Sequence, residues 1–183
     1  MTTLTAFVVV VALVGVERIA EMVVSTRNAA WSFSRGGVES GRGHYPVMVV
    51  LHTGFLVAML VEAFVVRPHV PAALAWSMLA LVVAAQALRW WCIATLGRRW
   101  NTRVIVVPGL APVRSGPYRW FSHPNYVAVV VEGLALPLVH GAWITALVFT
   151  LANAALLTVR IRAEEQALAT LPTPGAEGDR VDA

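Results

Sequence analysis

The chain has 183 residues, of which 58% are apolar and 13% charged, and its net charge at pH 7 is +4. A soluble domain is about half apolar and about a quarter charged, so this composition excludes an ordinary soluble domain and predicts an integral membrane protein. All basic residues are arginine, and in a membrane protein such an excess indicates topology, so no nucleic-acid partner is expected. The single cysteine, Cys92, excludes a disulfide or a cysteine-based metal site within one chain.

Five apolar stretches approach the length of about 20 residues that a helix needs to cross a bilayer. They are about Leu4–Val24, Pro46–Val66, Ala72–Ala94, Tyr126–His140 and Ala142–Val159. The fourth stretch is short and has Pro137 near its end, so the last two are expected to form a helical hairpin that turns at His140 and Gly141. We therefore predict an all-α integral membrane protein, a bundle of about five transmembrane helices.

The domain organisation follows from the same pattern. Residues 1–170 are predicted to form a single domain, and residues 171–183 a disordered cytoplasmic tail, because the tail is polar and rich in Pro and Gly. The chain contains no G-x-G-x-x-G sequence and no P-loop, so a Rossmann cofactor domain is not expected. The histidines are scattered along the chain and predict no metal site.

The arginines are distributed unequally between the two ends of the predicted helices. On one side only Arg67 is found, whereas the other side carries Arg27, Arg35, Arg42, Arg98, Arg99, Arg103, Arg114, Arg119, Arg160, Arg162 and Arg180. By the positive-inside rule, the N-terminus is expected outside and the C-terminus in the cytoplasm. The first connection, about Ser25–Tyr45, is predicted to be a loop that lies at the membrane surface.

Six charged residues fall inside the apolar stretches, where a charge is expensive unless it is paired or functional. They are Glu17, Arg18, Glu21, Glu62, Arg89 and Glu132. Glu17 and Glu21 share one helix face, so pairing with a base such as Arg89 is expected. Gln86 lies within one turn of Arg89, and both lead towards the Gly97–Trp100 corner, where they are candidates to line a pocket.

The longest polar stretch, about Gly97–Phe121, leads into His123 and Pro124. Loops of this length in a small domain are usually functional. Proline suits the first turn of a helix and restricts the residue before it, so His123 is expected just before the fourth helix. Tyr118, His123 and Tyr126 then converge with the free amide groups of the helix start. This arrangement fits a pocket for a polar ligand and, equally, an interfacial aromatic belt with a capping histidine.

Arg160 and Glu164 lie four residues apart on one face of the fifth helix, with Glu165 beside them. The spacing alone favours an ion pair at the cytoplasmic end of the helix. The alternative is a catalytic pair, in which the guanidinium of Arg160 binds a carboxylate or an oxyanion. Glu164 then orients Arg160 or takes a proton from a substrate hydroxyl.

The chain resembles the isoprenylcysteine carboxyl methyltransferase family over about Gln86 to Leu168. The motifs that carry the resemblance are Leu96-Gly-Arg-Arg-Trp100, Val113-Arg-Ser-Gly-Pro-Tyr-Arg-Trp-Phe-Ser-His-Pro-Asn-Tyr126 and Arg160-x-x-x-Glu164-Glu165-x-x-Leu168. The resemblance implies a bundle that binds S-adenosylmethionine at its cytoplasmic end, within residues 86–170, and takes a lipophilic substrate sideways from the surrounding membrane lipids. It further implies that Arg160 and Glu164 are catalytic and that the cofactor is bound by Gln86, Tyr118, Arg119, His123, Pro124, Tyr126 and Glu165.

This chain departs from the family pattern at Ser122, where an arginine usually precedes the His-Pro pair, and at Ala128, where a glycine is usual. Its N-terminal half resembles a bacterial branch, associated with type III polyketide synthases, that methylates alkylpyrones or alkylresorcinols. We therefore expect an O-methyltransferase of a bacterial cell membrane, acting on such a lipid or on a prenylcysteine-like carboxylate. The alternatives are an NADPH-dependent membrane reductase and a non-catalytic membrane protein. The sequence does not indicate an oligomeric state.

Overall fold

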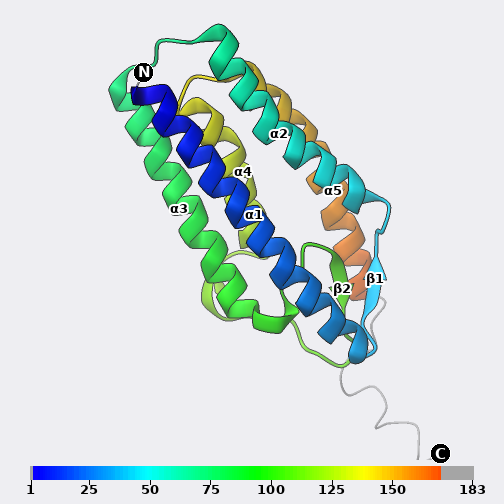
Figure 1. The fold of residues 1–183 in the computed structure, drawn as a ribbon. Coiled ribbons are helices and arrows are strands. Elements are labelled where there is room, and N and C mark those ends of the chain that lie inside the picture. The colour runs from blue at the N-terminus through cyan, green and yellow to red at the C-terminus, as the bar shows by residue number, and fades with distance from the viewer. Residues whose placement is uncertain (1, 170–183) are drawn as a thin grey trace, which may run out of the picture.

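The computed structural model describes residues 2–169, so the tail predicted at 171–183 lies outside the described residues. The elements in chain order are α1 (Thr2–Ser34), β1 (Val38–Ser40), α2 (His44–Val66), α3 (Ala72–Leu96), the helical turn η1 (Gly97–Arg99), β2 (Val104–Val106), the helical turn η2 (Gly116–Arg119), α4 (Pro124–Leu138) and α5 (Trp143–Ala169) (Figure 1). The two strands form a small antiparallel ribbon in which Val38 pairs with Val106 and Ser40 with Val104. The predicted all-α architecture is confirmed.

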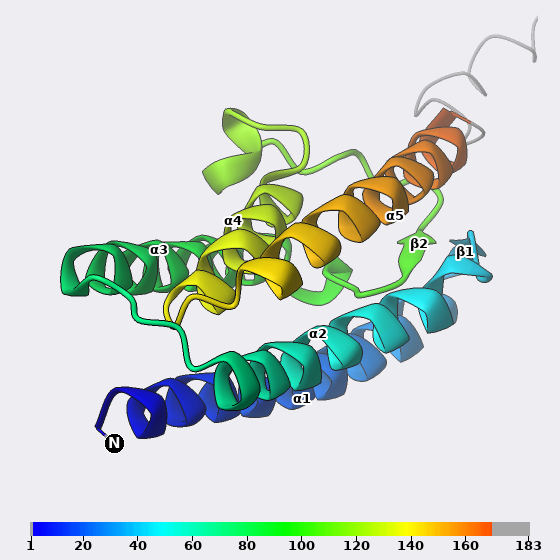
Figure 2. The same ribbon diagram turned by 90° about the horizontal axis from the view of Figure 1, so that it is seen from above.

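The helices form a bundle in which α4 lies between α3 and α5, as the view from above shows (Figure 2). The N-terminus and the turn between α4 and α5 lie at one end of the bundle, and β1 and β2 lie at the other (Figure 1). The short α4 is flanked by longer helices, so the chain between α3 and α4 folds over the end of the bundle that carries the strands. That end receives most of the polar sequence.

Three helices, α2, α3 with η1, and α5, are long and apolar enough to cross a membrane. The outer face of α1 is also apolar, since Leu13, Val16 and Ile19 are each more than 60% exposed. In water such a surface is unfavourable, but hydrocarbon solvates it without penalty. The predicted membrane location of the bundle is therefore supported by what its helices expose as well as by their length.

Helix α1 continues ten residues beyond Val24, where the first apolar stretch was expected to end. The prediction of a loop at about Ser25–Tyr45 was therefore wrong for residues 25–34, and only the part from Arg35 to Gly43 connects two helices. Helical geometry persists because buried polar side chains of this segment bond to the chain that follows α3. Asn28, for example, donates to the carbonyl of Trp100 at 2.7 Å.

The core lies at the end of the bundle that is remote from the strands, where Phe55 stacks on Phe149 with ring centroids 4.0 Å apart. The predicted hairpin of α4 and α5 turns through Gly141, whose φ of 72° is left-handed. An added Cβ there would meet Pro68 and Val70 of the connection between α2 and α3, so glycine is required both for the turn and for the close approach.

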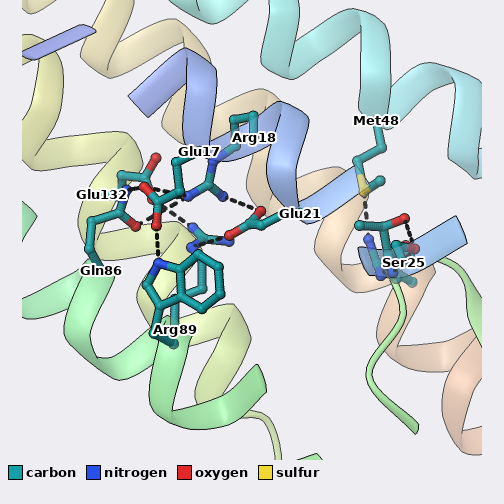
Figure 3. Close-up of polar contacts among 11 residues, drawn as sticks. Glu17, Arg18, Glu21, Ser25, Met48, Gln86, Arg89 and Glu132 are labelled. Carbon is teal, nitrogen blue, oxygen red and sulfur yellow. Dashed lines mark hydrogen bonds and ion pairs between the residues drawn. The ribbon is translucent and has the colours of Figure 1, made fainter. Parts of the chain in front are cut away.

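Five of the six charges predicted inside the helices form one network between α1, α3 and α4, on the left of Figure 3. Arg89 donates to Glu132 at 2.6 Å and lies 3.6 Å from Glu21, while Arg18 pairs with Glu21 at 2.9 Å. Gln86 accepts a hydrogen bond from Arg18 at 3.2 Å and donates one to Glu17. The predicted internal pairing is thus confirmed, with Arg89 as a partner of Glu21, whereas Glu17 pairs with Arg18 at 3.5 Å.

Glu62 has a different role, because it caps the first turn of α5 from the neighbouring helix α2. Its carboxylate accepts hydrogen bonds from the amides of Ile144 at 3.0 Å and Thr145 at 2.8 Å, and from the Thr145 hydroxyl at 2.7 Å. Substitution by leucine should lower the free energy of unfolding by about 1–2 kcal/mol, as the loss of an N-terminal helix cap does. Denaturation of the purified protein in detergent, monitored by circular dichroism, measures the change in the free energy of unfolding.

The matched control is Glu62→Gln, which keeps one acceptor oxygen and is expected to lose only part of the stability. Equal stability of the leucine variant and the parent would show that α5 does not depend on this cap.

Candidate functional site

A cavity of about 820 Å³ opens at the end of the bundle that carries the strands. Its wall is built from the chain between α3 and α4, the start of α4 and the C-terminal part of α5. Volumes of about 300–1,000 Å³ are typical of pockets for small ligands. The side chains that line it include aromatic, charged and apolar residues, so the cavity offers a polar ligand and a lipophilic group adjacent surfaces.

The wall nearest α3 is held in place by the far end of α1. The backbone turns out of α3 at Gly97, whose φ of 53° is left-handed. The side-chain amide of Asn28 stabilises this turn by donating to the carbonyls of Gly97 and Trp100. Thr102 follows, and its amide and hydroxyl both bond to Ser25. The polar positions 25, 28 and 32 recur at helical spacing on α1, and that stripe is the sequence signal that predicts a buried contact beyond Val24.

The opposite wall begins at Gly116, the first residue of the turn η2, which has a left-handed φ of 55°. An added Cβ at Gly116 would overlap the Thr95 side chain, so the glycine lets η2 lie directly on α3. This contact places Tyr118 in the wall of the cavity, beside Cys92 of α3. Burial raises the pKa of the Tyr118 phenol above its usual range, so the group remains protonated at neutral pH.

His123 lies immediately before α4, as predicted, because Pro124 occupies the first position of that helix. The His123 ring stacks on the Tyr126 ring, with centroids 5.2 Å apart and planes inclined by 16°. Nδ1 of His123 lies 3.8 Å from Oε2 of Glu164 on α5. The two aromatic rings therefore face the end of α5 from the start of α4.

Arg160 and Glu164 do not pair directly in the part of the chain that the structure describes, so the ion pair favoured by their spacing is not formed. Tyr126 lies between them: its hydroxyl donates to Glu164 Oε2 at 2.7 Å and accepts from Arg160 Nε at 3.1 Å. The guanidinium also lies over the Tyr126 ring, 5.4 Å from its centroid. Residues from two helices thus form a chain from His123 through Glu164 and Tyr126 to Arg160.

The other nitrogens of Arg160 contact groups that carry no charge. Nη2 donates to the carbonyl of Thr102 and Nη1 contacts the sulfur of Met48. Arg160 is only 8% exposed. A buried charge normally has a charged partner, yet within the described residues the direct partners of this guanidinium are a phenol, a carbonyl and a thioether.

The cavity carries an excess of positive charge, because it is lined by Glu164 and Glu165 but also by Arg99, Arg103, Arg114, Arg119 and Arg160. It also contains unused hydrogen-bond acceptors. The side-chain oxygens Oδ1 of Asn101 and Asn125 are buried in its wall and have no hydrogen-bond partner. Buried polar atoms are rarely left unpaired in proteins, so these two oxygens are available to a bound molecule.

The structure gathers most of the predicted site residues around this cavity. Those that line it are Tyr118, Arg119, His123, Tyr126, Arg160, Glu164 and Glu165. Pro124 is buried behind the wall and sets the start of α4, whereas Gln86 lies apart, in the network around Arg18. Sequence reasoning missed Met48 and Thr102, which contact Arg160 from distant parts of the chain. No group of three or more potential metal ligands occurs within residues 2–169.

Comparison with known proteins places this arrangement in a family. The model of the isoprenylcysteine carboxyl methyltransferase family matches residues 78–170, the segment that supplies most of the cavity wall. The chain belongs to this family. It is 38% identical over 162 residues to YpbQ, an uncharacterized protein of Bacillus subtilis, covering 88% of this chain and 96% of that one. It is also 26% identical over 155 residues to an uncharacterized protein of Haemophilus influenzae, covering 84% and 90%.

No solved structure gives a significant match. Family membership and the apolar outer surface together support a methyltransferase that is embedded in the membrane. The matched segment contains Tyr126, Arg160 and Glu164, but Ser25 and Met48 lie outside it. Neither relative's name specifies a substrate, so the alkylpyrone and alkylresorcinol branch expected from the sequence is not confirmed.

Proposed function

We propose that this protein transfers a methyl group from S-adenosylmethionine to an oxygen atom of a lipophilic acceptor that reaches the cavity from the bilayer. The observation that carries the proposal is the buried guanidinium of Arg160, which faces the cavity without a direct carboxylate partner. An anionic oxygen of the acceptor would complete its coordination, since the guanidinium geometry matches such groups. Membership of a methyltransferase family supports the reaction type.

The residues present fit S-adenosylmethionine. The cavity is large enough for a molecule of that size beside part of an acceptor. The free Oδ1 atoms of Asn101 and Asn125 would accept from its amino groups, and Arg119 would pair with its carboxylate. The stacked rings of His123 and Tyr126 provide an aromatic surface for the cationic sulfonium or the adenine.

When bound, S-adenosylmethionine supplies a methyl group that is already activated by the sulfonium, so the protein's task is to position the acceptor. A guanidinium has five N–H donors, and three nitrogens of Arg160 each use one, which leaves two donors for an acceptor oxygen. If the acceptor carries a hydroxyl, Glu164 would take its proton. The Tyr126 hydroxyl bonds to both Glu164 and Arg160 and so fixes the position of one side chain relative to the other.

The acceptor is proposed to be an alkylpyrone or alkylresorcinol lipid or a prenylcysteine-like carboxylate. The excess of arginine in the cavity wall favours an acceptor that is acidic or becomes anionic. Apolar side chains of the same wall, including Ile105, Leu110 and Leu168, suit the adjoining hydrocarbon chain. With the arginine-rich end in the cytoplasm and the N-terminus outside a bacterial cell membrane, the site would face the cytoplasmic pool of S-adenosylmethionine.

Calorimetric titration of the detergent-purified protein with S-adenosylmethionine tests the proposal, and saturable binding is expected. His123→Ala should weaken this binding by about tenfold, because the variant removes one stacked wall of the cavity, an effect equivalent to about 1.4 kcal/mol. The matched control is His69→Ala, since His69 lies in the connection between α2 and α3 at the other end of the bundle.

A parallel titration with NADPH separates the proposed function from its alternatives. Binding of NADPH in place of S-adenosylmethionine would contradict the proposal and favour a membrane reductase. Binding of neither molecule to folded protein would favour a non-catalytic membrane protein.

A further inference from the structure

We propose that Ser25 of α1 is a positioning residue for Arg160, acting through Thr102, so that the N-terminal helix completes the active site. The inference rests on the proposed function, because it assigns Arg160 to the acceptor. Ser25 and Met48 lie together in Figure 3, well apart from the charged network around Arg18 and Arg89. The polar contacts near Ser25 therefore form a separate group at the end of the bundle that carries the cavity.

Ser25 holds Thr102 by two contacts. The Ser25 hydroxyl oxygen accepts a hydrogen bond from the Thr102 amide at 2.9 Å, and it forms a second hydrogen bond with the Thr102 hydroxyl at 2.8 Å. Thr102 in turn offers its backbone carbonyl to Nη2 of Arg160. Three residues from α1, the chain after η1, and α5 are thus connected in a single line of hydrogen bonds.

The surroundings make this connection specific. Ser25 is only 4% exposed, so water does not take the place of its hydroxyl when that hydroxyl is removed. The buried groups of Thr102 that bond to it are then left without this partner, which is costly. The hydroxyl of the neighbouring Thr26 bonds to a carbonyl of α1 itself, that of Met22. The bonds of Ser25 instead go to a residue 77 positions further along the chain.

Thr102 lies where its orientation matters. It stands between the turn η1, which Asn28 fixes through Gly97 and Trp100, and the strand β2, which β1 fixes by pairing. No ladder hydrogen bond of β2 includes Thr102, so the orientation of its carbonyl depends on Ser25. A shift of that carbonyl would move the Nη2 end of Arg160, and small displacements of catalytic groups lower rates strongly.

The test compares Ser25→Ala with Ser25→Thr and with the control Thr26→Ala in lipid nanodiscs. The assays are methyl transfer from S-adenosylmethionine to a long-chain alkylresorcinol and to a prenylcysteine, calorimetric binding of S-adenosylmethionine, and NMR of isotope-labelled arginine side chains. The Arg160 signal is assigned by its absence from Arg160→Lys. We expect Ser25→Ala to shift this signal and to lower kcat about tenfold, with cofactor affinity within about twofold of the parent.

Ser25→Thr should restore most of the turnover and the original signal, because it keeps the hydroxyl, and Thr26→Ala should change neither. An unshifted Arg160 signal with unchanged kcat in Ser25→Ala would overturn the inference. Equal loss of cofactor binding and turnover would assign Ser25 a merely structural role and also overturn it.

Two further outcomes are distinguishable. If Ser25→Ala does not fold, Ser25→Cys replaces it, since the thiol fills a similar volume but is a weaker hydrogen-bond partner for both the amide and the hydroxyl of Thr102. A shifted Arg160 signal in this variant supports the inference and an unshifted one overturns it. If the parent protein transfers no methyl group but the Arg160 signal moves in Ser25→Ala, the positioning role stands and the proposed function fails.

Discussion

Replacement of Arg160 by lysine should lower kcat for methyl transfer by about 100-fold to 1,000-fold, the range found when one donor to a developing or bound oxyanion is removed. Lysine keeps the positive charge, but it cannot bond to Tyr126 and Thr102 at once and still offer two donors to an acceptor. The measurement is the initial rate of transfer from labelled S-adenosylmethionine to the acceptors named above, with the protein in nanodiscs.

The matched control is Arg162→Lys, because Arg162 lies on the same helix but is exposed and does not line the cavity. It should retain turnover close to that of the parent. A rate within about threefold of the parent for Arg160→Lys would contradict the assignment, since a loss of that size corresponds to less than one hydrogen bond. Calorimetry on both variants separates a defect in cofactor binding from a defect in transfer.

The second large effect concerns stability. Substitution of Arg89 by methionine should lower the free energy of unfolding by about 3–5 kcal/mol, the cost typical of removing one partner from a buried ion pair. Arg89 is 5% exposed and pairs with Glu132 at 2.6 Å and with Glu21 at 3.6 Å. Methionine fills a similar volume but leaves Arg18 as the only cation beside three glutamates of this network.

Equilibrium denaturation in detergent measures this loss, and Arg67→Met is its surface control. Arg67 is exposed and bonds only to a carbonyl of its own helix among the described contacts, so its removal should change stability by less than about 0.5 kcal/mol. The double variant Arg89→Met with Glu132→Leu should recover part of the stability, because both members of the pair are then apolar. A loss below about 1 kcal/mol for Arg89→Met would show that the network is not needed for folding.

Several features of the molecule were determined by short segments of the sequence. The apolar stretches predicted all five helices, because a long apolar run can satisfy its backbone in a membrane only as a helix. The His123-Pro124 pair predicted the start of α4 within one residue, since proline restricts its own backbone and that of the residue before it. The turn between α4 and α5 was likewise predicted from a short segment, the residues around Gly141, whose φ is left-handed.

Other features depended on which helices pack together. Gln86 was placed beside the pocket from its position on α3, but the rotation of that helix directs it to Arg18 on α1. The end of α1 was predicted at Val24 because the residues beyond it are polar, but these polar side chains are buried by contacts with Gly97, Trp100 and Thr102, and the helix continues.

The candidate site shows the same division. Residue types and the motif spacing identified Tyr126, Arg160 and Glu164, but the spacing favoured a direct ion pair between the last two. The packing of α4 on α5 inserts the Tyr126 hydroxyl between them. Helix α2 brings Met48 to Arg160, and Ser25 of α1 bonds to Thr102, whose carbonyl accepts from Arg160. Helix starts, turns and apolar length are decided by neighbours in the chain, whereas the partners of a buried guanidinium are decided by helices that meet only when the bundle is complete.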